Sequence, residues 1–290
     1  MKKKDIQLPG ERRVDAVVVS DIHLGTYGCQ AKQLVAYLKS ISPEVLILNG
    51  DIIDIWQFSK SYFPKSHLKV IRHILKMMES GTKVYYLAGN HDEVLRRFVG
   101  LSLGNLFLEN KIVLELDGKK SWIFHGDVFD VVMHHSKWLA KLGAVGYGLL
   151  TQINRLVNAL LIILGQQKIS LSRDVKTAVK SKKTITTRFE KTVSQLAIKK
   201  GYEYAICGHI HRPEKKTLRT NEGTVTYLNS GDWVENLTAL EYYDNDWHLV
   251  YCERKENLKD EEEDAKITGD LLTPNEKILF KTMFKDVIAS

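Results

Sequence analysis

A chain of 290 residues is long enough to bury a full core, as one large domain or as a domain with an insertion. Its hydrophobic fraction of 44% and charged fraction of 27% are typical of a globular protein. Three scattered cysteines exclude a disulfide framework or a zinc knuckle and fit a reducing, cytoplasmic compartment, and no apolar stretch that would indicate a secretory signal follows the basic start. The net charge of +7 favours an anionic partner, for which nucleic acid, an anionic membrane surface and a phosphorylated substrate all qualify.

The first part of the chain alternates predicted strands and helices, which favours α/β units with a largely parallel sheet. Residues 14–20 form a continuous apolar run, as expected of a strand buried on both faces. A helix over residues 65–80 is predicted to bury one apolar face. That face carries Leu68, Ile71, Leu75 and Met78. The predicted elements are strands over 14–20, 45–48 and 83–87 and helices over 30–42 and 65–80.

The later part of the core is predicted to consist of β-strands. Asp117-Gly118 between two apolar runs predicts a hairpin, and Asp244-Asn245-Asp246 predicts a turn. The predicted strands cover residues 112–116, 121–124, 204–207, 224–228, 238–243 and 247–252. We therefore expect an α/β fold with two sheets and helices outside them, a four-layered αββα sandwich.

The core is expected to span residues 1–127 and 201–255, and residues 128–200 are predicted to be a helical insertion at the mouth of the site. Residues 256–290 are predicted to be an acidic linker and a C-terminal helix. Thr273-Pro274 is typical of the start of such a helix.

Polar residues suited to metal ions follow five of the predicted strands. Sites in α/β sheets form at the carboxyl ends of strands, so these stretches are expected to meet in space. One such stretch means little, whereas five in this order favour a metal site. Carboxylate, imidazole and amide ligands without a thiolate suit divalent Mn, Fe or Zn. The candidate ligands are Asp21, His23, Asp51, Asn90, His125, His209 and His211.

This donor set suits a pair of metal ions. Two ions about 3.5–4 Å apart can clamp an in-line phosphoryl displacement and lower the pKa of a water between them. A carboxylate is needed that reaches both ions, and Asp51 suits that role. The sequence therefore predicts a two-metal phosphoesterase.

The order of the stretches, D-x-H, G-D, G-N-H-D, H-G-D and G-H-x-H, resembles the calcineurin-like metallophosphoesterase family over about residues 14–255. The resemblance implies a metallophosphoesterase sandwich and two divalent metals, manganese being expected first and iron or zinc next. It implies one metal held by Asp21, His23, Asp51 and His211, and the other by Asp51, Asn90, His125 and His209. It also implies that His91 is a general acid or phosphate binder at the leaving group, oriented by Asp92.

Two further features resemble the UDP-2,3-diacylglucosamine pyrophosphatase group of that family. One is the stretch over residues 229–236, N-S-G-D-W-V-E-N, and the other is the long insertion before His209. The resemblance implies attack of water on a UDP-sugar diphosphate, which yields UMP and a lipid sugar 1-phosphate. The chain departs from the group at His91, where that group often has Arg, so the exact substrate stays open.

The insertion is predicted to be a lid that binds acyl chains. Residues 149–164 form an amphipathic stretch, with no apolar run near the ~20 residues needed to cross a bilayer, and residues 168–200 are sharply basic. This combination favours a peripheral position on the anionic inner face of the cell membrane. The expected substrate contacts are Asn90, His91, Asp130, Arg173, Lys180, Lys183 and His209.

Other functions stay open. The same site could hydrolyse another nucleotide or lipid phosphate ester, and a non-enzymatic membrane-associated scaffold would be expected to have lost ligands. Nucleic acid is disfavoured because the basic residues accompany an aliphatic helix instead of aromatic stacking residues. Packing of the amphipathic stretch on the core, or in a homodimer, is the alternative to a lid.

Overall fold

The structure of the chain is a computed structural model that describes residues 12–56, 63–129 and 179–253, with side chains in the last range from Phe189 onward. Among these residues, seven strands form a mixed sheet in the order β12-β11-β1-β2-β3-β5-β4. Its strands are β1 (Arg12–Val19), β2 (Ile41–Asn49), β3 (Lys83–Leu87), β4 (Ser102–Leu103), β5 (Leu106–Glu109), β11 (Thr238–Tyr243) and β12 (Asp246–Tyr251). The strands β1, β2, β3 and β5 run parallel to one another.

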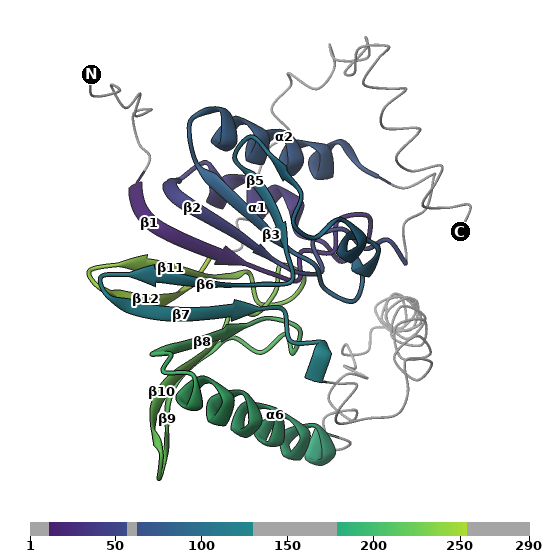
Figure 1. The fold of residues 1–290 in the computed structure, drawn as a ribbon. Coiled ribbons are helices and arrows are strands. Elements are labelled where there is room, and N and C mark those ends of the chain that lie inside the picture. Colours follow the sequence, from purple (N-terminus) through teal and green to yellow (C-terminus); the bar gives the residue numbers. More distant parts are fainter. Residues whose placement is uncertain (1–11, 57–62, 130–178, 254–290) are drawn as a thin grey trace, which may run out of the picture.

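In the described part of the chain, a second sheet has the order β6-β7-β8-β10-β9. Its strands are β6 (Lys111–Leu116), β7 (Lys119–Phe124), β8 (Tyr204–Cys207), β9 (Glu214–Thr220) and β10 (Gly223–Asn229). The described helices are α1 (Ala31–Leu38), α2 (Lys65–Glu79), the 3-10 helix η1 (Glu93–Phe98) and α6 (Val179–Lys199). The two sheets lie face to face, with α1 and α2 outside one and α6 outside the other (Figure 1). The predicted αββα sandwich is confirmed.

Three apolar clusters fill the three spaces between these layers. The strand β1 supplies two of them, because its side chains alternate between the faces of the sheet. Val17 and Val19 pack toward α1 and α2, whereas Ala16 and Val18 pack between the two sheets. Phe189, Val193 and Ala197 of α6 pack on the outer face of the second sheet. All four of the named β1 residues are fully buried, as expected of a strand covered on both faces.

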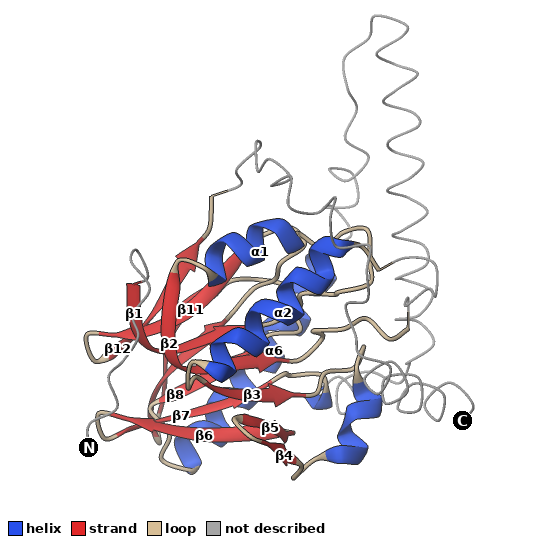
Figure 2. Cartoon of the chain, turned by 90° about the horizontal axis from the view of Figure 1, so that it is seen from above, coloured by secondary structure: helices blue, strands red, loops and turns tan. Residues whose placement is uncertain are grey.

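The helix α2 lies beside α1 (Figure 2), and it buries a different stripe from the one predicted. The buried residues are His67, Val70, Ile74 and Met77. Leu68 and Leu75 are 41% and 50% exposed, whereas Ile71 and Met78 are partly buried against the core, so half of the predicted face was wrong. His67 lies on the buried side, where its ring Nδ1 accepts a hydrogen bond from Gly25 N–H at 2.9 Å, and this contact favours the observed rotation of the helix. A count of apolar residues alone does not include this histidine.

Other differences from the predicted elements are local. β4, β5, β9 and η1 were not predicted, and β2 begins at Ile41, so that Ser42-Pro43 lies inside a strand instead of ending a helix. Pro43 is tolerated because pairing of β2 with β3 begins further on, at Val45, and the missing N–H leaves no gap in that ladder. The predicted hairpin is confirmed, with Asp117 and Gly118 both at positive φ.

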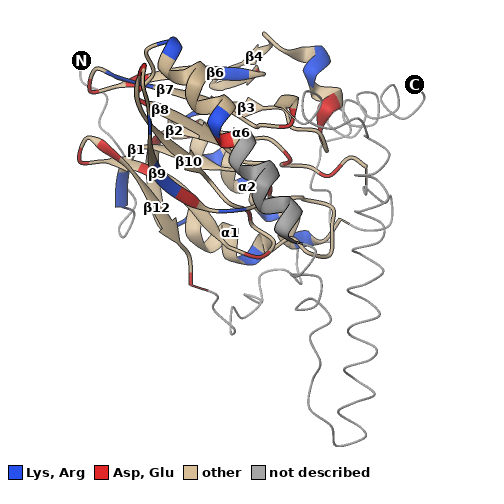
Figure 3. Cartoon of the chain, turned by 90° about the horizontal axis from the view of Figure 1, so that it is seen from below, with Lys and Arg blue, Asp and Glu red and all other residues tan. Residues whose placement is uncertain are grey.

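The predicted insertion, residues 128–200, is described only in part. It includes α6, whose C-terminal half forms the outer layer of the core, so this end of the interval is not separate from the sandwich. Residues 130–178, and with them the amphipathic stretch and the first part of the basic segment, lie outside the described residues, as do residues 256–290. In the described segments, basic and acidic positions are interspersed along the strands and turns (Figure 3). None of the helices described is long and apolar enough to cross a membrane.

Candidate metal centre

The loops that follow five strands meet at one end of the sandwich. Asp21 and Asp51 come after β1 and β2, His91 after β3, His125 after β7 and His209 after β8. Backbone hydrogen bonds hold adjacent loops together, for example from Asp21 N to Gly50 O at 3.0 Å and from Gly208 N to His125 O at 2.9 Å. The site is thus assembled at the carboxyl ends of strands from both sheets.

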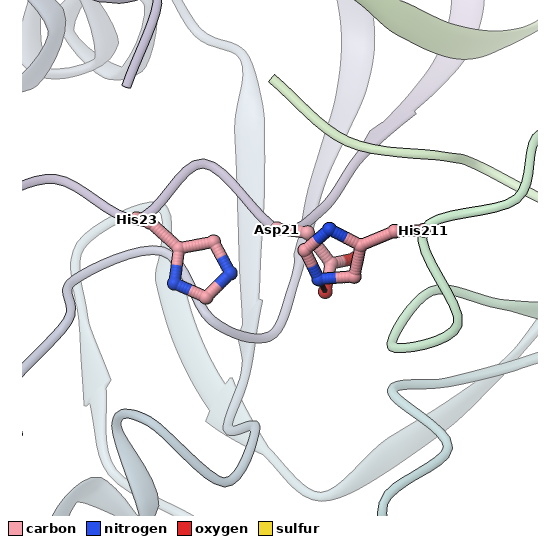
Figure 4. Close-up of side chains that lie close together, drawn as sticks. All are labelled: Asp21, His23 and His211. Atoms are coloured by element: carbon pink, nitrogen blue, oxygen red, sulfur yellow. Dashed lines mark ion pairs between the residues drawn. The ribbon is translucent and has the colours of Figure 1, made fainter. Parts of the chain in front are cut away.

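Three groups of side chains in this region have candidate ligand atoms within 4.8 Å of one another, and all of them contain predicted ligands. The groups are Asp21, His23 and His211; His23, Asp51 and His91; and Asp51, His125 and His209. Figure 4 shows the first group, in which the ring of His211 lies over the Asp21 carboxylate and the ring of His23 faces them from the same loop as Asp21. Because Asp51 and His23 each belong to two groups, the groups form one continuous cluster.

The backbone of the cluster is unusual. Asp21, His23, Asp51, His209 and His211 all adopt positive φ, between 51° and 64°. Residues with a side chain rarely adopt this conformation, and each such residue costs about 1–3 kcal/mol. Among the described residues, three other Asp or Asn residues with positive φ lie in hairpin turns, where it is expected. Strain concentrated at five predicted ligands indicates that the fold holds them for a functional purpose.

Hydrogen bonds orient the imidazoles with Nε2 toward the cluster. His125 Nδ1 donates to the carbonyl oxygen of Asn49 at 2.8 Å, and His23 Nδ1 donates to Asp54 Oδ2 at 3.2 Å. Such contacts fix the tautomer, leaving Nε2 as the unprotonated nitrogen that can bind a metal. Within the described structure, His23 Nε2 and Asn90 Oδ1 are buried without a hydrogen-bond partner. His125 Nε2 and Asp21 Oδ1 also lack a hydrogen bond of good geometry, although Asp51 Oδ2 lies 3.3 Å from the first and His211 Nε2 lies 3.1 Å from the second. Buried polar atoms are rarely left unpaired, so these four atoms fit a bound cation.

A glycine makes room for this cluster. A Cβ atom at Gly89 would lie 2.6 Å from Asp51 N and 2.8 Å from His125 Nε2, and it would overlap the Asp51 carboxylate. No side chain fits there without moving backbone. The G-N-H-D stretch therefore needs its glycine so that Asn90 and His91 can approach Asp51.

The charges of the cluster are strongly coupled. Burial opposes ionisation of Asp51, but the neighbouring His125 outweighs it and holds the pKa of Asp51 well below its usual range. Burial likewise opposes protonation of the imidazoles, yet Asp51 raises the pKa of His125 to about 10 and Asp21 raises the pKa of His211 to about 9. In the metal-free protein, the rings of His125 and His211 are therefore protonated near neutral pH, and a bound metal ion would have to displace these protons.

His91 is paired with Asp54, a residue that the sequence did not single out. His91 Nδ1 lies 2.9 Å from Asp54 Oδ2, the same oxygen that His23 contacts, and Asp54 is fully buried. Burial opposes protonation of the His91 ring, but the pairing with Asp54 and the nearby Asp51 together raise the pKa of His91. The ring of Trp56 lies against His91 with its centroid 4.5 Å away.

The expected orienting contact from Asp92 is not what the structure contains. Asp92 Oδ1 accepts from Gly89 N at 2.6 Å, and Oδ2 accepts from Ile52 N at 2.9 Å and Tyr86 Oη at 2.6 Å. Asp92 thus holds the loop, and Asp54 takes the predicted place beside His91. Of the predicted substrate contacts, Asp130 and Arg173 lie outside the described residues, as do the side chains of Lys180 and Lys183.

Comparisons with known proteins agree with this geometry. Residues 15–213 match the family described as Calcineurin-like phosphoesterase. A protein of Aliivibrio fischeri (strain MJ11) described as UDP-2,3-diacylglucosamine hydrolase is 26% identical over 227 residues, which cover 76% of this chain and 88% of that protein. One of Stenotrophomonas maltophilia (strain R551-3) with the same description is 24% identical over 249 residues, covering 82% and 98%. A solved archaeal phosphodiesterase aligns with a TM-score of 0.38 and 15% identity, over 81% of this chain and 98% of its own.

Proposed function

The chain belongs to the calcineurin-like phosphoesterase family and is a metal-dependent phosphoesterase, and from this premise we propose that it cleaves the diphosphate of a lipid-linked nucleotide sugar. The proposed substrate is UDP-2,3-diacylglucosamine, and the products are UMP and the lipid sugar 1-phosphate. The observation that carries the hydrolytic part is the continuous ligand cluster with His91 at its edge. The substrate is supported by relatives described as hydrolases of that compound.

Two divalent cations would be held by the predicted ligands, with Asp51 shared between them. One set is Asp21, His23, Asp51 and His211, and the other is Asp51, Asn90, His125 and His209. When bound, such cations supply Lewis-acid polarisation of the phosphoryl oxygens and a lowered pKa for the attacking water. The oxygen and nitrogen donors suit manganese first, with iron or zinc as alternatives.

His91 would donate a proton to the leaving-group oxygen. Its Nδ1 faces Asp54, so Nε2 is the nitrogen directed toward the cluster, where it lies 4.0 Å from Asp51 Oδ2. The Asp54 carboxylate favours the protonated ring, which is the state that a general acid needs. The phosphate leaving group departs with additional negative charge, and a proton from His91 would neutralise part of that charge.

The lipid part of the substrate is assigned to the insertion. Its amphipathic residues 149–164 would bind acyl chains, and its basic residues would meet the diphosphate and an anionic membrane surface. Residues 149–164 and the basic residues that precede α6 lie outside the described part of the chain, so their sequence pattern supports this part of the proposal. The alternative is that residues 149–164 form the interface of a homodimer instead of binding acyl chains.

One assay tests the proposal. Purified protein, stripped of metal and reloaded with Mn²⁺, is given UDP-2,3-diacylglucosamine and, in parallel, an aryl phosphodiester, and UMP and phenol release are followed. We expect metal-dependent release of UMP, loss of both activities in Asp51→Asn, and loss of the lipid activity alone when residues 143–183 are removed. Hydrolysis of the aryl ester without UMP release would refute the substrate but keep the phosphoesterase.

A further inference from the structure

Residues 229–236, N-S-G-D-W-V-E-N, comprise the last residue of β10 and most of the loop to β11. They contact two of the loops that carry predicted ligands, although they contribute none of those ligands. Asn229, Ser230, Asp232 and Trp233 are each no more than 1% exposed. Buried polar groups need hydrogen-bond partners. Those of Asn229, Ser230 and the backbone of Trp233 include atoms of two ligand-bearing loops.

The first set of partners is the loop that carries Asp21. The hydroxyls of Ser230 and Ser20 are 2.6 Å apart, and Ser20 Oγ also lies 3.1 Å from the carbonyl oxygen of Gly231. Trp233 N donates to the carbonyl oxygen of Asp21 at 3.1 Å. These contacts hold both the residue before the ligand and the backbone of the ligand itself, which has a strained positive φ.

The second set of partners is the loop that carries His211. Asn229 Nδ2 donates to Gly208 O at 2.7 Å, at the start of this loop, and Asn236 Nδ2 donates to the carbonyl oxygen of His211 at 3.0 Å. Asp232 Oδ2 faces Nδ1 of the His211 ring at 3.8 Å, while Nε2 of that ring lies 3.1 Å from Asp21 Oδ1. Both ends of the His211 loop are therefore attached to residues 229–236.

Asp232 is itself held firmly. Its Oδ1 accepts from the backbone N–H groups of Val234 at 2.8 Å and Glu235 at 2.6 Å. Its Oδ2 accepts from the side chain of Asn236. The carboxylate cannot rotate without breaking these bonds, so it is a fixed acceptor beside the His211 ring.

The other proposed metal position is built differently. The ring of His125 is oriented by the carbonyl oxygen of Asn49, at the end of β2, and its Nε2 lies 3.3 Å from Asp51 Oδ2. His209, the other histidine of this position, shares the loop of His211, and Asn229 holds the start of that loop through Gly208 O. Asp232 and Asn236, however, contact His211 and neither His125 nor Asp51 in the described structure.

We propose that Asp232 and Asn236 position His211 and so set the affinity of the metal position that includes His211 more than that of the other. Asp232 is a positioning residue: its charge, 3.8 Å from His211 Nδ1, favours the ring orientation that turns Nε2 toward Asp21. The inference rests on the two-metal site proposed above.

The test is metal binding, measured as Mn²⁺ per chain by mass spectrometry and by calorimetric titration, for wild type, Asp232→Asn and Asn236→Ala. Asp232→Asn keeps an oxygen for the backbone N–H groups but removes the charge that faces His211. We expect one Mn²⁺ to bind about 10–100-fold more weakly in Asp232→Asn and the other to bind as in wild type. Asn236→Ala should weaken the same position. Asp246→Asn is the control, because Asp246 likewise accepts a backbone N–H, from Trp247, but in a hairpin away from the centre.

The outcomes separate this inference from the proposal beneath it. Wild-type affinities at both positions in Asp232→Asn, or equal weakening of both, would overturn the role of the loop. Equal weakening together with a lower unfolding temperature of the metal-free variant would show a merely structural role, which also overturns it. Wild-type protein that binds fewer than two ions would instead contradict the two-metal site, and the inference with it.

Discussion

Replacing Asp54 by asparagine removes a negative charge that contacts both His91 and His23. The two imidazoles, acting against burial, bring the pKa of Asp54 down to about 2 from its usual 3.8. At about 1.4 kcal/mol per pKa unit, the ionised carboxylate is stabilised by about 2 kcal/mol. By the same linkage Asp54 stabilises the protonated ring of His91, so Asp54→Asn should lower the pKa of His91. We expect kcat for substrates with poor leaving groups to fall about 100-fold, the lower end of a general-acid contribution.

The assay is a series of aryl phosphodiesters whose leaving phenols span a range of pKa values, turned over by the Mn²⁺-loaded enzyme. The plot of log kcat against leaving-group pKa should become steeper in Asp54→Asn, with less than about 10-fold loss for the most acidic phenol. Asp127→Asn is the matched control, since Asp127 pairs with Arg96 at 2.7 Å. Equal loss across the series, at unchanged metal content, would refute the role of Asp54.

Four further predictions concern the ligand cluster and the core. Gly89→Ala should lower Mn²⁺ affinity by about 10-fold or more, measured by calorimetry, because the new Cβ overlaps Asp51; unchanged affinity would show that the loop relaxes freely. Loading metal at pH 7 should release protons, counted by calorimetry in buffers of different ionisation enthalpy, because the pKa values of His125 and His211 are raised to about 10 and about 9. The same raised pKa values stabilise the metal-free fold below pH 6.5, and this stabilisation should be lost as the pH rises toward 10. The midpoint of urea unfolding should therefore fall over this pH range, and a midpoint that rises with pH would contradict the prediction. Glu241→Ala should lower the free energy of unfolding by about 1–2 kcal/mol in urea titrations, because it leaves the buried hydroxyl of Tyr37 without its acceptor at 2.9 Å, whereas the half-exposed guanidinium of Arg12 can bind water instead. A loss below about 0.5 kcal/mol would be too small for a buried hydroxyl left unpaired.

Much of the sandwich could be predicted because hydrophobic periodicity follows from burial. The run over residues 14–20 indicates a strand covered on both faces, and β1 is such a strand. The rotation of α2 could not be predicted, since it depends on a hydrogen bond between His67 and a loop 42 residues away in the sequence. The short strand β4 has both residues exposed, so burial left no periodic pattern there.

The site shows the same division. The residue types and their places after strands indicate metal chemistry, and the structure brings those residues together. Asp54 was not predicted to pair with His91, nor Asp232 with His211, because the members of each pair are far apart in the sequence. An aspartate in a loop is also common, so neither aspartate stands out in the sequence. Asp92 was expected beside the His91 ring because it is adjacent in sequence, yet its carboxylate turns toward backbone N–H groups. The positive φ of Asp21 could not be predicted either, since no glycine marks it.

The most direct test of the account is an anomalous difference map from crystals of the protein loaded with Mn²⁺. If Asp51 bridges two ions, the map should contain two peaks about 3.5–4 Å apart, both within bonding distance of Asp51. One peak should lie beside His211 and the other beside His125. A single peak, or peaks away from Asp51, would contradict the assignment of these residues as a shared two-metal site.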